Sequence, residues 1–298
     1  MAENIQKPKG MMVKEPQILQ DFLIQTFKQN TKSSIKSWIH NRRIKINDRI
    51  QTKYNFELRI GDIVELVKPT IQKQVRFDGL KILFEDEHLL VIDKEEGLLS
   101  IAGQNKEEIT AFRILSNYVK EENTKNRIYV IHRLDKDTSG VMMYAKSEEI
   151  QEIMQRNWKQ WVKERTYIAL LEGELPQENG KIESYLKEGN SFMVHSSFKD
   201  NGGQFAVLEY KRLMTNSRNS LVEVSLETGK KNQIRVQFQS IGFPLVGDKK
   251  YGAKTNPIKR LGLHAKTLVF THPISGKEMN FDVNPPKSFF QLLNGKLY

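Results

Sequence analysis

The chain has 298 residues, 38% of them hydrophobic, and its 47 Lys and Arg against 36 Asp and Glu give a formal net charge of +11. This length and composition predict about two globular domains, and the excess of positive charge favours a polyanionic partner such as nucleic acid or an anionic membrane surface. The absence of cysteine excludes disulfides, thiolate nucleophiles and cysteine-bound metal centres.

The apolar residues and the histidines exclude further classes. No apolar run reaches the roughly 18 residues that cross a bilayer, and the first 14 residues lack the apolar core of a signal peptide. The six histidines show no paired spacing typical of a metal site. We therefore expect a cytoplasmic protein that enters no membrane and binds no metal.

Residues 15–70 predict a small αβ domain. They follow a polar, basic segment, residues 1–14, which lacks periodicity and is expected to be a flexible tail. Apolar residues around Phe22 repeat at helical spacing, and a second helical pattern begins at Ser33. A short strand at 44–46 and a strand pair around the Gly61 turn complete the domain.

The charge of this small domain is strongly one-sided. Eight basic residues between positions 28 and 53 face a single acid, Asp48; they are Lys28, Lys32, Lys36, Arg42, Arg43, Lys45, Arg49 and Lys53. A cationic surface of this density suits contacts with phosphate groups.

The order of helices and strands in residues 15–70 resembles the S-four RNA-binding domain, which is named after a small-subunit ribosomal protein. The resemblance implies RNA binding by Lys32, Arg42 and Arg43. Arg42 stands where that family usually has a turn glycine, and Lys32 stands where it has an arginine. The alternative interpretation is a solvated basic helical hairpin with no specific partner.

Residues 71–80 predict a linker, and residues 81–298 predict a larger α+β domain built on a mainly antiparallel mixed sheet. Its first segments read as strands at 82–84 and 89–92, followed by a helix with Ile109, Phe112, Leu115 and Val119 on one face. Another helix is capped by Ser147, with Trp158 and Trp161 in its apolar stripe, and strands dominate the remainder.

Four segments of the larger domain carry the residues best suited to chemistry. They are 84–94, HRLDKDTSG at 132–140, KERTYIA at 163–169, and LETGKKNQIRV at 226–236 with its continuation through 242–252 and 263–265. The second segment sets a charged cluster at the end of an apolar strand, where functional residues often lie. Taken alone, Asp135 in this segment could equally be a structural acid that pairs with Arg133.

In order and wording these segments resemble the RluA-like pseudouridine synthases, which isomerise uridine in structured RNA without a cofactor. The resemblance implies that Asp135 is the nucleophile, that Arg235 is its cationic partner, and that Tyr167 lies next to the target base. Arg133 would occupy the gap left by the extruded nucleotide, and Lys230 would contact a phosphate. Lys230 replaces an arginine of the family pattern GRxHQIR.

Three alternatives to this hypothesis follow from the same residues. Tyr167 on an alternating strand could be a core aromatic, and Arg235 on a helix could be a solvated charge. A glycoside hydrolase would need two carboxylates facing each other across the bond, and Asp135 and Asp137 on one short segment are poorly placed for that. A non-catalytic RNA-binding ribosome assembly factor is the third alternative.

The sequence thus predicts an RNA pseudouridine synthase whose S-four-like domain raises RNA affinity. By resemblance, the two-domain arrangement is most similar to members that act on large-subunit ribosomal RNA, and transfer RNA remains open as a substrate. We expect a monomer that needs no cofactor.

Overall fold

The computed structural model describes residues 10–28, 30–40, 43–66, 75–103, 107–189 and 193–294. The chain divides into two compact units, residues 1–75 and residues 76–298, and each is described by itself. Arg42 lies outside the described residues.

The small unit packs two helices against short strands. Its elements are β1 Met11–Met12, β2 Gln17–Ile18, α1 Leu19–Thr26, α2 Lys32–His40, β3 Ile44–Ile46, β4 Arg49–Ile50, β5 Glu57–Leu58 and β6 Ile63–Leu66. The strands order as β1-β6-β3-β4, with β2 and β5 as a separate pair. Leu19, Leu23 and Ile35 of the helices are fully buried against Ile44 and Val64 of the strands, as the apolar spacing predicts.

The expectation of a flexible tail is wrong for residues 11–13. Met11 and Met12 form β1 and pair with Val64 and Ile63 of β6, and Val13 is fully buried. Backbone pairing and one buried valine therefore hold this polar segment to the sheet, although it shows no periodicity of its own.

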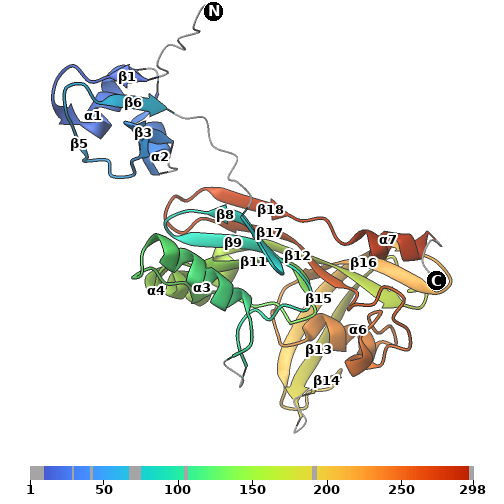
Figure 1. Ribbon diagram of the computed structural model, residues 1–298. Helices are drawn as coiled ribbons and strands as arrows, with labels where there is room; N and C mark the ends of the chain where they lie inside the picture. The colour runs from blue at the N-terminus through green and yellow to red at the C-terminus, as the bar shows by residue number, and fades with distance from the viewer. Residues whose placement is uncertain are drawn as a thin grey trace, which may run out of the picture. The chain divides into compact units, whose positions relative to one another are not determined.

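The larger unit is a sheet flanked by helices (Figure 1). Its elements are β7 Arg76–Phe77, β8 Leu80–Glu85, β9 Leu89–Lys94, α3 Ala111–Glu122, β10 Tyr129–Val130, β11 Ser139–Ala145, α4 Glu148–Arg156, α5 Trp158–Trp161, β12 Val162–Glu172, β13 Asn179–Glu188, β14 Val194–Ser197, β15 Gln204–Thr215, β16 Asn219–Leu226, α6 Gln233–Ser240, the 3-10 helix η1 Lys249–Tyr251, β17 Leu263–Thr271, β18 Glu278–Asp282 and α7 Lys287–Leu293.

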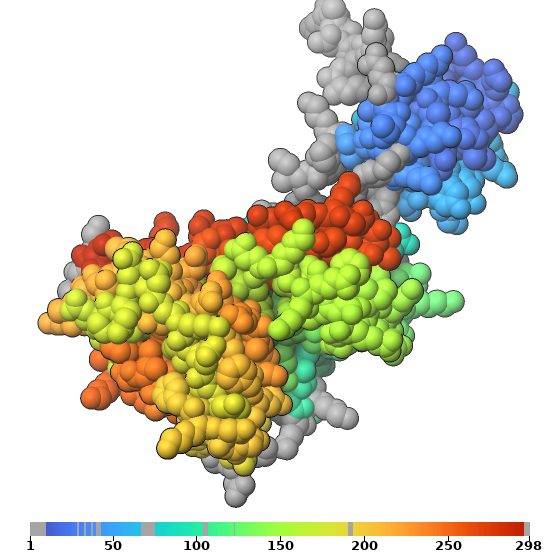
Figure 2. All heavy atoms as spheres, turned by 180° about the vertical axis from the view of Figure 1, so that it is seen from behind, coloured from blue at the N-terminus to red at the C-terminus, as the bar shows by residue number. Residues whose placement is uncertain are grey.

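The strands of the larger unit form one sheet in the order β14-β13-β15-β16-β12-β17-β11-β9-β8-β7, with β10 on β11 and β18 on β17. Within the described residues its pairs are antiparallel except β11 with β17, which confirms the predicted α+β class with a mainly antiparallel mixed sheet. In Figure 1, α3 and α4 lie beside β9 and β11, α6 lies beside β13 and β14, and α7 lies beside β16. Figure 2 shows α4 and α5 (green) and β13–β15 (yellow) covering different parts of one face of this unit.

Gly140 lets β11 begin directly beside β17. Its φ is +112°, and a Cβ at this position would lie 2.0 Å from the carbonyl oxygen of Ala265. Only glycine combines that φ with so close an approach of two backbones. This glycine therefore brings the end of the HRLDKDTSG segment onto the central strands.

Three smaller expectations for the larger unit are corrected. Residues 76–80 are part of a hairpin, in which Arg76 and Phe77 pair with Lys81 and Leu80, so the linker does not reach Leu80. Ile109 precedes the cap of α3, Thr110, and is 69% exposed. The two tryptophans form the short helix α5, separate from α4.

Among the described residues, no helix has the length and apolar character that a membrane crossing requires.

Candidate active site

The loop that carries Asp135 is fixed on both sides of that residue. Before it, the Leu134 N–H donates to the Ser100 hydroxyl oxygen (3.2 Å), and that hydroxyl donates to the Leu134 carbonyl (2.7 Å). After it, the Lys136 carbonyl accepts from Lys94 Nζ and from the Gly97 N–H, each at 3.0 Å. These bonds hold the backbone rigid on both sides of Asp135. The Asp135 side chain is 30% exposed.

Lys94 places a buried amino group beneath this loop. It is fully buried at the end of β9, and Nζ donates to the carbonyls of Glu95 (2.9 Å), Leu98 (2.8 Å) and Lys136. Burial lowers the pKa of Lys94 to about 8, and the nearby carboxylates of Asp137 and Asp135 act in the opposite direction. The sequence prediction treated Lys94 only as part of a motif. The sequence feature that could have identified it as a site residue is a lysine at the end of a buried apolar strand.

Arg235 reaches Asp135 from α6. Its side chain is 11% exposed, and Nη1 lies 3.5 Å from Asp135 Oδ2. Nε and Nη2 make a bidentate pair with Asp248 at 2.7 and 2.8 Å. Although burial disfavours the charged guanidinium, Asp248 and Asp135 raise the pKa of Arg235 above its ordinary value. Arg235 is therefore an oriented cation at the proposed nucleophile.

Asp248 and Asn232 hold Arg235 in place, and the sequence prediction gave neither a role in orienting it. The Asp248 side chain is 1% exposed, and Asn232, in the left-handed conformation (φ 54°), accepts from Arg235 Nη1 at 3.2 Å. Asn232 also donates to the Tyr251 hydroxyl (3.0 Å), and the Arg235 guanidinium lies over the Tyr251 ring, 5.0 Å from its centroid. The signal for Asp248 was an acid two residues after the buried pair 245–246.

Tyr167 lies on β12 and is 6% exposed. Burial raises the pKa of Tyr167, with Asp135 acting in the same direction and Arg165 against it. Its hydroxyl makes no hydrogen bond with another described residue. A protonated, unpartnered phenol is suited to packing against a base and donating a hydrogen bond to it more than to abstracting a proton at neutral pH.

The predicted RNA contacts divide between the two units. Arg133 is exposed beside Asp135, and Lys230 is partly exposed just before α6, where its N–H donates to Gln233 Oε1 at 3.0 Å. In the small unit, Lys32 is exposed at the start of α2, and the Arg43 guanidinium lies over the Trp38 ring, 5.7 Å from its centroid.

His264 ties the end of the loop that carries Asp135 to β17. Because the Val283 carbonyl only accepts, His264 Nε2 donates to it (3.1 Å), and Nδ1 then accepts from the Ser139 hydroxyl (2.8 Å). Ser139 Oγ in turn accepts from Arg260 Nη2 at 2.7 Å. Burial lowers the pKa of His264 to about 4, so the ring is neutral in the folded protein at neutral pH.

This neutral histidine predicts acid sensitivity. The unfolded chain takes up a proton on His264 near pH 6.5 and the folded protein takes it up only near pH 4, so stability falls as the pH falls through that window. Between pH 7.5 and 5 the native protein is expected to lose about 2 kcal/mol more unfolding free energy than His264→Gln. Urea unfolding at both pH values measures the difference, and an equal loss in the two proteins would contradict it.

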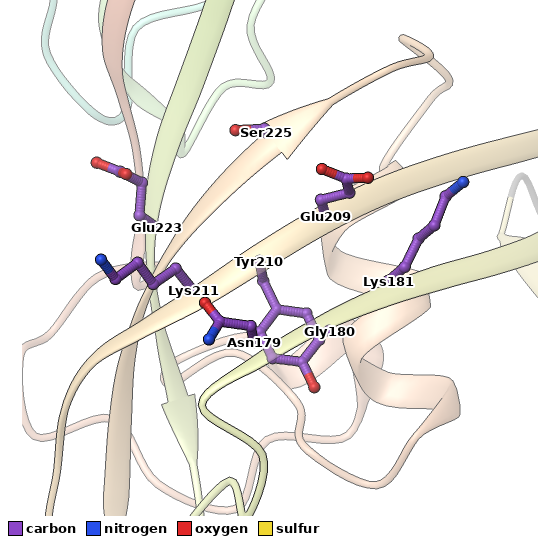
Figure 3. Close-up of a pocket in the computed structure, with 8 residues that line it drawn as sticks. All are labelled: Asn179, Gly180, Lys181, Glu209, Tyr210, Lys211, Glu223 and Ser225. Atoms are coloured by element: carbon purple, nitrogen blue, oxygen red, sulfur yellow. The ribbon is translucent and has the colours of Figure 1, made fainter.

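A surface pocket of about 470 Å³ lies elsewhere, over β13, β15 and β16 (Figure 3). In Figure 3, Glu209 and Tyr210 lie on opposite sides of β15. The charges around the pocket are mixed, since Lys181 pairs with Glu183 at 2.8 Å and with Glu227 at 3.6 Å. The pocket is lined by none of the predicted site residues.

The described residues also contain no cluster of three side chains suited to a metal ion.

Residues 88–240 match the profile of a family described as RNA pseudouridylate synthase. The chain is 31% identical over 258 residues to the RNA pseudouridine synthase YhcT of Bacillus subtilis, covering 85% of each protein. It is 31% identical over 289 residues to the ribosomal large subunit pseudouridine synthase D of Nitrosomonas europaea, covering 92% of this chain and 83% of that one. The solved structure of human RNA pseudouridylate synthase domain containing 4 has a TM-score of 0.59 at 25% identity, covering 73% of this chain and 93% of that one.

The family match spans the segment from β9 to α6, which contains Asp135, Tyr167 and Arg235. It confirms the family that the four sequence segments predict. The chain belongs to the RNA pseudouridylate synthase family and is an RluA-like RNA pseudouridine synthase, an isomerase that converts uridine in RNA to pseudouridine.

Proposed function

We propose that this enzyme isomerises uridine in large-subunit ribosomal RNA with Asp135 as the nucleophile. The observation that carries the proposal is the contact of Arg235, which is held by Asp248, with the carboxylate of Asp135 at 3.5 Å. Relatives named ribosomal large subunit pseudouridine synthase D, from Nitrosomonas europaea and Haemophilus influenzae, align with 92% and 93% of this chain and support ribosomal RNA as the substrate. Transfer RNA is the alternative substrate.

The reaction needs a nucleophile and a site that retains the cleaved base. In our proposal an oxygen of Asp135 bonds transiently to the nucleoside as the bond between C1′ and N1 breaks. The uracil then turns, C5 bonds to C1′, Asp135 is released, the proton of C5 leaves to solvent, and N1 takes up a proton from solvent. Atoms and electrons balance without a redox partner. Arg235 orients the carboxylate, and Tyr167 packs against the uracil while it turns.

Positive side chains around this site would hold the RNA. Arg133 would fill the gap left by the flipped nucleotide, and Lys230 would contact a phosphate. In the small unit, an S-four-like domain in this proposal, Lys32, Arg42 and Arg43 would bind the backbone of the same RNA. We further propose that the enzyme acts in the cytoplasm, and that it acts as a monomer, because one chain supplies all three proposed catalytic residues.

Chemical mapping of pseudouridine in total RNA tests this function. Cells that carry the native gene are compared with cells that carry the Asp135→Ala version. We expect a site in large-subunit ribosomal RNA to lose its pseudouridine in the variant alone. Loss confined to transfer RNA would overturn the proposed substrate, and unchanged modification at every position would overturn the role of Asp135.

A further inference from the structure

The guanidinium of Arg165 is held beside the active site with little to balance its charge. It lies over the ring of Trp158, 5.5 Å from the ring centroid, and Nη2 donates to the Thr228 carbonyl at 3.2 Å. Nε is shielded from solvent and has no hydrogen-bond partner, and Nη1 makes no hydrogen bond with any described residue. Among the described residues, no carboxylate lies within ion-pair distance of Arg165.

Two other partly buried arginines of this unit are matched by acids, whereas a third, Arg212, donates to the carbonyls of Leu175 and Pro176. Arg235 pairs with Asp248 at 2.7 Å, and Arg260 pairs with Glu96 at 2.5 Å. A partly buried cation without an acid loses hydration and gains no ion pair, which costs stability unless an anion arrives from outside. The environment of Arg165 is therefore that of a residue that binds an anionic group of a ligand.

The surrounding backbone is shaped to leave room for this guanidinium. A Cβ on Gly229 would lie 3.0 Å from Nη2 and 3.2 Å from Nη1 of Arg165, closer than side chains ordinarily pack. The ring of Trp158 also packs against the group. The guanidinium is thus closely packed, and its remaining N–H donors keep a fixed direction.

Arg165 lies at the same site as the proposed catalytic residues. It precedes Tyr167 by two residues on β12, so both side chains lie on the same face of the strand. Thr228 and Gly229 lead through Lys230 into α6, which carries Arg235. His132 lies three residues before Asp135. Burial lowers the pKa of His132 to about 3, and the charge of Arg165 contributes to the same shift.

We propose that Arg165 binds a backbone phosphate of the RNA next to the reacting uridine and so positions that nucleotide over Asp135. A uracil carries no charge that could balance the guanidinium, whereas RNA supplies one phosphate per nucleotide, and arginine recognises phosphate with a planar set of N–H donors. The inference rests on the proposed active site, and Arg165 acts in it as a positioning residue.

The test compares Arg165→Met and Arg165→Lys with a matched control, Lys163→Met. Lys163 lies on the same strand but is exposed and already paired with Glu278 at 2.8 Å. Because the C5 hydrogen of uridine is expelled, tritium release from RNA labelled at that carbon gives the rate; the RNA is taken from cells that lack this gene. Binding to a fluorescein-labelled oligouridylate is followed by anisotropy over a range of salt concentrations.

For Arg165→Met we expect an apparent KM about tenfold higher, a single-turnover rate within about threefold of the native enzyme, and a salt slope smaller by about 0.7, as for one lost phosphate contact. Arg165→Lys should recover part of the affinity, and Lys163→Met should match the native enzyme. Gly229→Val, which crowds the guanidinium without removing it, should raise KM as well.

Two results would overturn the inference. Native KM and native salt slope in Arg165→Met would show that the arginine is only structural. A slower single turnover with unchanged KM would show that it acts on the uracil. Neither result depends on the identity of the nucleophile, because a failure of Asp135 as nucleophile would appear as retained turnover in an Asp135 variant.

Discussion

Asp135→Asn is expected to lower the isomerisation rate by at least about 10³-fold while RNA affinity stays within about twofold of the native value. The asparagine has nearly the same shape, and Ser100 and Lys94 hold the backbone on either side of it, so the loop should keep its conformation. What is lost is the negative charge that, in our proposal, attacks the nucleoside. Tritium release under single-turnover conditions gives the rate, and anisotropy with labelled RNA gives the affinity.

Asp137→Asn is the matched control for this variant, because Asp137 lies on the same loop and its side chain is exposed. It should keep most of the native rate. If Asp135→Asn retained more than about a tenth of the native rate, Asp135 would not be the nucleophile. If it lost RNA affinity in proportion to the rate, its charge would serve binding, not chemistry.

Much of this site could be predicted from sequence because its proposed catalytic residues lie in segments with recognisable wording. Asp135, Tyr167 and Arg235 each belong to one of the four segments, and their order along the chain was sufficient to propose a common site. The mainly antiparallel sheet was predictable for another reason, since many strands with few helices between them follow α5, an arrangement typical of an α+β domain.

The supporting contacts could not be predicted, because they join positions that are far apart in sequence. Ser100 bonds to Leu134 across 34 residues, and Lys94 bonds to Lys136 across 42. Such pairs depend on how β9 and the loop that carries Asp135 pack, and local propensity carries no signal for that packing. The unmatched charge of Arg165 is hidden for the same reason, since a lack of partners appears only in three dimensions.

Asp248→Asn is expected to lower the unfolding free energy by about 3 kcal/mol and to slow isomerisation by about 10²-fold. Asp248 is buried, accepts two hydrogen bonds from Arg235 and also accepts from the Tyr251 N–H at 3.3 Å. The amide keeps one acceptor oxygen but removes the buried negative charge. Arg235 would then turn toward Asp135, the remaining carboxylate in contact with it, and pull the nucleophile away from its attacking position. Urea unfolding and single-turnover rates below the melting temperature of the variant measure the two effects.

A double variant separates the ion pair from the general cost of altering a buried site. Arg235→Met alone leaves Asp248 as an unpaired buried charge and should destabilise the protein by a similar amount, about 3 kcal/mol. In Arg235→Met with Asp248→Asn neither charge is left unpaired, so the combined loss should be at least about 1 kcal/mol smaller than the sum of the single losses. Activity should stay as low as in the worse single variant, because the cation at Asp135 is absent. Strictly additive losses of stability would show that Asp248 and Arg235 act independently, and Asp248 would then have no part in holding Arg235 at the nucleophile.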